Sequence, residues 1–152
     1  MNLIPRTHLV WIVGLVLKLA AAGDCGAAPQ VVEQAFANKY PGVGMPQWEI
    51  DAHGQWEARF EKDGTTLRAD FTDQGTWIQT EQSIESQQLP GPVRSVIETR
   101  FGGEKLVEVE AVDSPKFGHY FDVEFKRDGG KNRDVAFDEN GNEVDLSGAG
   151  TG

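Results

Sequence analysis

The residues of this chain most able to do chemistry are carboxylates placed two positions apart. Glu49 and Asp51 form one such pair, and Glu108 and Glu110 form another. Residues two apart in a strand point to the same face of a sheet, so these pairs could hold a hard cation such as calcium across neighbouring strands. Solvated surface charge is the simpler interpretation, because exposed carboxylates usually stay in water.

Catalytic and metal-binding patterns are missing from the sequence after residue 22. His53 and His119 are the only histidines there, each beside a glycine, and Cys25 is the only cysteine. Zinc sites need several His or Cys ligands at defined spacing. The chain also has no G-x-S-x-G elbow and no glycine-rich phosphate loop. The stretches 73–75 and 138–141 read as turns, because the distal ligands of a calcium loop are missing. We predict no catalytic residue, no metal site and no cofactor.

Residues 1–22 have the pattern of a secretory signal peptide. Arg6 precedes an apolar run from Leu9 to Leu17, and small residues follow at 20–23. The run is too short for a membrane span, although a retained interfacial anchor is an alternative. We therefore expect an exported protein, periplasmic or secreted, with a flexible tail at residues 23–28.

Cys25 follows this segment directly and could carry a lipid. The preceding Asp24 stands where lipoprotein processing prefers a small residue, so a lipid anchor at Cys25 is an alternative that we do not favour. A single cysteine forms no intrachain disulfide, even in an oxidising compartment. The other end of the chain, residues 147–152, is rich in glycine and is expected to be disordered.

The net charge excludes two classes of partner. The whole chain carries −10, and removal of residues 1–22 takes away Arg6 and Lys18 but no acid, which leaves −12. A charge of this sign argues against binding to nucleic acid, whose phosphates need Lys and Arg. It also argues against electrostatic attraction to anionic lipid. A basic protein or peptide, or a cation, remains open, and solubility alone is the simplest explanation.

The sequence repeats one helix-plus-strands pattern twice. Helical spacing of apolar residues, with Pro near the start and Gly at the stop, predicts helices within 29–42 and 91–103. Four alternating runs follow each helix, with Asp-Gly or Asn-Gly at several of the turns between them. The first copy spans 29–83, a connector spans 84–90 and the second copy spans 91–146. We predict an α+β fold of two tandem helix-plus-four-strand units, with the helices on one face of an antiparallel sheet.

The order of these aromatic and turn residues resembles a known family. The pattern AF…KYPG…W…F…DG…F.D.G.W…E…LP..V over residues 35–93, repeated more loosely up to Leu146, is similar to the PepSY-like family, which is also described as β-lactamase-inhibitor-like. The resemblance implies a secreted or periplasmic protein of tandem helix-plus-sheet units. It also implies a protein-binding or inhibitory role without catalytic residues.

Aligning the two copies predicts which side chains face the helices. Apolar columns such as Phe60 with Phe125, Phe71 with Phe137, and Ile78 with Val144 should face them, with Trp48, Ile50, Val107 and Val109 in the same layer. The opposite, outer face is then mainly acidic. Trp77 aligns with Glu143 and falls on that outer face, where an aromatic side chain could anchor a partner. Alternatively, the connector 84–90 folds over it.

We therefore predict a non-enzymatic binding or inhibitory module that recognises a protein or peptide through the open sheet face. The partner is expected to be basic. The alternative is an envelope cation-binding or sensing protein that uses the same acidic face. The expected partner-binding residues are Trp77, Tyr120, Glu49, Asp51, Glu57, Glu108, Glu110, Asp122 and Glu124.

Overall fold

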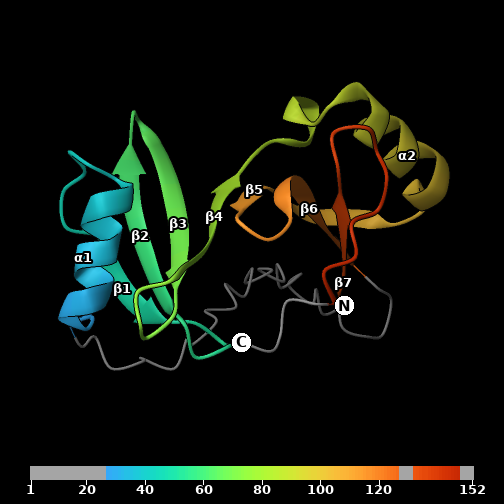
Figure 1. Cartoon of the computed structure of the whole chain (residues 1–152). Helices are drawn as coiled ribbons and strands as arrows, with labels where there is room; N and C mark the ends of the chain where they lie inside the picture. The colour runs from blue at the N-terminus through green and yellow to red at the C-terminus, as the bar shows by residue number, and fades with distance from the viewer. Residues whose placement is uncertain (1–26, 127–131, 148–152) are drawn as a thin grey trace, which may run out of the picture.

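A computed structural model describes residues 27–126 and 132–147, which form one antiparallel sheet with two helices (Figure 1). The expected signal peptide, Cys25 and the residues after Ser147 lie outside the described residues. Seven strands follow one another in sequence order across the sheet. The elements are α1 Gln30–Lys39, β1 Gln47–Ile50, β2 Trp56–Lys62, β3 Thr65–Phe71, β4 Trp77–Ser83, a short 3₁₀ helix Ser86–Gln88, α2 Gly91–Phe101, β5 Lys105–Ser114, β6 Gly118–Lys126 and β7 Arg133–Phe137.

Both helices pack on the same face of the sheet, as the alternation predicts. Val32 and Phe36 of α1, together with Tyr40 just after the helix, form a core with residues of β1 to β3. The second core joins Val93 and Phe101 of α2 to β5, β6 and β7. We call this the inner face and its opposite the outer face. Ala28, which falls in the expected tail, is 5% exposed and belongs to the first core.

The α+β class is confirmed, but the two units are not equal. The first has four strands, β1 to β4. In the second, three strands are followed by an isolated bridge between Phe137 and Glu143. Past Val144 the chain leaves the sheet, because the Asp145 carboxylate accepts a hydrogen bond from the Ser147 backbone N–H at 2.9 Å and bends the segment. The two units share one sheet, since β4 pairs with β5.

The repeated turn after β3 and β7 brings each of these turns against the start of a helix. Gly75 and Gly141 both have φ near +80°, at +79° and +83°. A Cβ on Gly75 would lie 2.8 Å from the Val31 carbonyl oxygen of α1, and one on Gly141 would lie 3.0 Å from the Pro92 oxygen of α2. The glycine therefore recurs for two reasons, its backbone conformation and the close approach of the helix.

The predicted outward positions of Trp77 and Glu143 are wrong, although their equivalence in the repeat is right. A β-bulge next to Phe71 places Trp77 opposite Phe71, on the inner face. There, the Lys39 ammonium lies 3.1 Å from the centre of the Trp77 ring. Glu143 pairs with Arg100 of α2 at 2.5 Å, also on the helix side. A bulge shifts strict alternation by one residue, which reverses the faces beyond it.

Three apolar positions also differ from the expected inner layer. Ile50 and Val107 are exposed, at 42% and 46%, because Ile50 ends an edge strand and Val107 lies in a bulge of β5. Val144 packs instead on the outer face, beside Tyr120.

Candidate functional site

The outer face carries rows of like charge that run across the strands. Glu49, Glu57 and Asp70 are direct cross-strand neighbours on β1, β2 and β3. A second row joins Glu108, Glu124 and Asp134 on β5, β6 and β7, and a third pair is formed by Glu110 and Asp122. Like charges directly opposite one another destabilise a sheet, so the face carries an unfavourable electrostatic energy.

The first row is partly buried. The Glu57 side chain is 12% exposed, and its pKa is raised to about 6, first by burial and then by the hydrogen bond with Glu49. Asp70 is 5% exposed, and burial raises its pKa as well, although the Gln79 amide donates a hydrogen bond to Asp70 Oδ2 at 3.0 Å. Arg59 lies 3.7 Å from Glu49 at the exposed side of the row.

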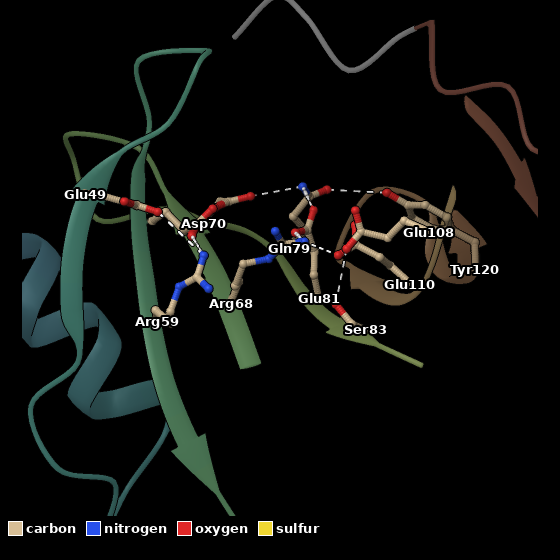
Figure 2. Close-up of polar contacts among 11 residues, drawn as sticks. Glu49, Arg59, Arg68, Asp70, Gln79, Glu81, Ser83, Glu108, Glu110 and Tyr120 are labelled. Carbon is tan, nitrogen blue, oxygen red and sulfur yellow. Dashed lines mark hydrogen bonds and ion pairs between the residues drawn. The ribbon is translucent and has the colours of Figure 1, made fainter. Parts of the chain in front are cut away.

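Arg68 lies at the centre of the outer face, where the two units meet (Figure 2). Its Nη2 is 2.7 Å from Glu81 Oε2 and also contacts Glu110 Oε1 of β5. One guanidinium thus serves two carboxylates that are only 16% and 14% exposed. Burial, followed by repulsion from Glu110, raises the pKa of Glu81 to about 7. Burial also raises the pKa of Glu110.

Five carboxylates line a hollow of about 280 Å³ on β5, β6 and β7, which we call the acidic hollow: Glu108, Glu110, Asp122, Glu124 and Asp134. Burial is the main cause of the raised pKa of Asp122 and of Asp134, and each is raised further by a neighbouring carboxylate. Asp122 Oδ1 is buried without a hydrogen-bond partner. The Asn132 amide donates to Glu124 Oε1 at 2.7 Å. In the described residues no group of three or more ligand-type side chains has the arrangement that holds a metal ion.

Tyr120 lies on the outer face as expected, but it is only 4% exposed. Val112 and Ala136 surround it, and Val144 and Leu146 from the C-terminal segment pack against this cluster. Its hydroxyl donates a hydrogen bond to Gln79 Oε1 at 3.4 Å, and burial raises its pKa. Tyr120 therefore supports the face from within instead of offering a free aromatic surface.

The structure places the nine residues predicted from the sequence in five different surroundings. Glu108, Glu110, Asp122 and Glu124 meet in the acidic hollow, and Glu49 and Glu57 meet in the first row. Asp51 accepts hydrogen bonds at 2.8 Å from the backbone N–H groups of His53 and Gln55, so it shapes the hairpin. Trp77 lies on the inner face and Tyr120 is buried.

The sequence analysis did not predict the ion pair of Arg68 and Glu81 at the centre of the outer face. Glu81 was not among the expected site residues, although it lies two positions after the outward-facing Gln79 in the same strand. The two-residue alternation was the signal that could have found it. The contact of Arg68 with both units gave no sequence signal, because Arg68 and Glu110 are distant in the chain.

Comparisons with known proteins agree with this architecture. The sequence profile of the PepSY-like family, described as beta-lactamase-inhibitor-like, matches residues 54–145. The chain belongs to this family. No curated protein matches the chain.

Several solved structures share the fold. A DUF2874 family protein from Bacteroides uniformis is 20% identical, with a TM-score of 0.67 over 78% of this chain and 88% of its own. A BLIP-like protein from Bacteroides fragilis is 23% identical, with a TM-score of 0.65 over 79% of this chain and 85% of its own. A Bacteroides eggerthii structure described as "putative periplasmic proteins" is 20% identical, with a TM-score of 0.64 over 79% and 88%. At these identities the likeness concerns the fold.

Proposed function

We propose that this chain is a non-enzymatic, exported binding module that recognises a basic segment of a protein through the outer face of its sheet. The observation that carries the proposal is the alignment of carboxylates in rows across the strands, where the register places like charges directly opposite one another. The family is β-lactamase-inhibitor-like, a non-catalytic kind of module. An inhibitor-like role needs binding and no chemistry.

The energetics of the face favour a cationic ligand. Burial and mutual repulsion raise the pKa of Glu110, Asp122 and Asp134, so each of these carboxylates is costly in its charged form. A Lys or Arg side chain from a partner would neutralise several of them at once. Each new ion pair would also form where the protein already excludes part of the water, and such pairs are stronger than fully exposed ones.

Export has separate support. Residues 1–22 have the composition of a signal peptide, and the Bacteroides eggerthii neighbour is described as periplasmic. None of the helices in the described part of the chain is long and apolar enough to cross a membrane. A periplasmic or secreted binding module fits these observations.

The test is capture of a partner from the envelope extract of the native host, compared between two variants of equal charge. The first removes three carboxylates of the acidic hollow: Glu110→Gln, Asp122→Asn and Glu124→Gln. The matched control removes three exposed acids elsewhere: Asp63→Asn, Glu98→Gln and Glu139→Gln. We expect the hollow variant to lose the protein that wild type and control retain. Equal capture by all three proteins would refute recognition through this face.

Calorimetric titration with calcium separates the alternative function, cation binding on the same face. The acidic hollow is the observation that favours it, because oxygen ligands suit calcium. Binding of calcium by the wild type and the control variant, but not by the hollow variant, would favour that function over protein recognition.

A further inference from the structure

The far edge of β7 is open over most of its length. In the described residues, only the isolated bridge between Phe137 and Glu143 joins it to the following segment. The two hydrogen bonds of this bridge run from the Val144 N–H to the Ala136 oxygen at 2.8 Å and from the Asp138 N–H to the Asn142 oxygen at 2.9 Å. In the first unit, by contrast, β3 pairs with β4 from Phe71 back to Arg68. The second unit therefore lacks most of the fourth strand that the first unit has.

The backbone of β7 is oriented to receive another strand. Because the Ala136 oxygen points away from β6 toward Val144, the alternation of a strand also directs the N–H and C=O of Asp134 to the open edge. The N–H of Ala136 points the same way. Within the described residues no strand pairs with β7 at Asp134 on the side away from β6. An edge with unpaired backbone groups is a template for an added strand.

A cavity runs along this edge. It measures about 610 Å³ and lies between residues 134–136 of β7 and the departing segment 143–146. This volume is typical of ligand sites in proteins. The bend at Asp145 and Ser147 therefore leaves room beside β7 that a few extended residues could fill.

The charges around the cavity indicate a basic occupant. Arg100 is paired with Glu143, and Arg133 with Glu104. Asp122, Asp134 and Asp145 also border the cavity or its edge, and in the described residues none of them forms an ion pair. Both arginines thus already have carboxylate partners, whereas the three aspartates have no cationic partner in the described residues.

We propose that an extended, basic segment of another protein adds to β7 as an antiparallel eighth strand, with a Lys or Arg opposite Asp134. The side chain opposite Asp134 would project from the outer face and extend the row of Glu108, Glu124 and Asp134 with a positive charge. This inference goes beyond the proposed function, because the backbone of β7, and not only the acidic face, recognises the partner.

The probe is a fluorescein-labelled, end-blocked peptide of sequence Thr-Lys-Val-Lys-Thr-Lys, whose lysines all project to one side of a strand. Two N-methylated isomers of this peptide are compared with it. The first carries a backbone N-methyl group on each lysine, and the second carries one on each Thr and Val. In the proposed pairing the lysine N–H groups face β7, so only the first isomer loses hydrogen bonds to it. Both isomers keep the same charge and composition.

We expect fluorescence anisotropy at low salt to show binding of the parent peptide. The lysine-methylated isomer should bind at least about tenfold more weakly, because each lost hydrogen bond weakens binding severalfold. The other isomer should bind as the parent does. Hydrogen exchange followed by NMR should show protection of the Asp134 and Ala136 amides when the parent peptide binds.

Four results would overturn the inference. Equal binding of both isomers would show attraction to the acidic face alone and would leave the proposed function standing. Absence of binding, or protection of β1 amides instead of those of β7, would remove β7 as the acceptor. A stable dimer in sedimentation, with the Asp134 amide already protected, would assign the edge to a second copy of this chain.

Discussion

Replacing Glu81 by Gln tests whether the centre of the outer face is under electrostatic strain. Glu81 lies 2.7 Å from Arg68 and its side chain is only 16% exposed. Burial and repulsion by Glu110 outweigh the attraction of Arg68, and they raise the pKa of Glu81 from 4.5 to about 7. The folded protein thus holds a proton on Glu81 at pH values where the unfolded chain has released it.

The sign of the pH dependence follows from this difference. A raised carboxyl pKa contributes stability that is fully present below about pH 4.5 and is lost as the pH rises to about 7. The difference between the pKa values of Glu81 in the unfolded and folded protein limits this contribution to the free energy of unfolding to about 3 kcal/mol. Gln resembles the protonated acid and does not titrate. The Glu81→Gln protein should therefore match the wild type near pH 4.5 and exceed its stability by up to about 3 kcal/mol at pH 8.

Urea denaturation at constant ionic strength and several pH values between 4.5 and 8 measures this difference. Glu61→Gln is the matched control, since Glu61 lies exposed in β2, and its effect should stay within about 0.5 kcal/mol at every pH. A Glu81→Gln protein that is less stable than wild type at pH 8, by a margin that grows with pH, would refute the reasoning. The Arg68 ion pair would then dominate over burial and repulsion.

Two further substitutions test the inner face. Trp77→Ala should lower the free energy of unfolding by roughly 2 kcal/mol, about half the cost for a fully buried aromatic side chain, because the ring is half-buried and lies under Lys39. An unchanged urea midpoint would indicate that the Trp77 side chain is exposed and does not pack on the inner face. Gly75→Ala should destabilise more than Gly54→Ala, by at least about 1 kcal/mol on the scale of overpacking costs. Both glycines have positive φ, at +79° and +80°, but only a Cβ at Gly75 meets the Val31 oxygen. Equal thermal stability of the two variants would contradict the close approach of α1.

Local sequence patterns determined the elements and most of the two faces. Alternation of apolar and polar residues, with glycine-containing turns between, placed seven strands and two helices near their observed ranges. It also placed Glu108, Glu110, Asp122 and Glu124 on one face, where they do meet. These features depend on residues close in the chain, because side-chain direction in a strand repeats every two residues.

Tertiary structure alone decided the features that depend on register and on distant neighbours. The bulge beside Phe71 turned Trp77 to the inner face, and a bulge is set by how two strands pair, not by the composition of either. Sharing of Arg68 between Glu81 and Glu110 needed β3, β4 and β5 side by side. The open edge of β7 arises because Asp145 bends the last segment away, whereas β4 in the equivalent position stays in the sheet. The fourth alternating run after the second helix, residues 142–146, predicted a strand there. Alternation, however, does not report whether a partner strand is within hydrogen-bonding reach.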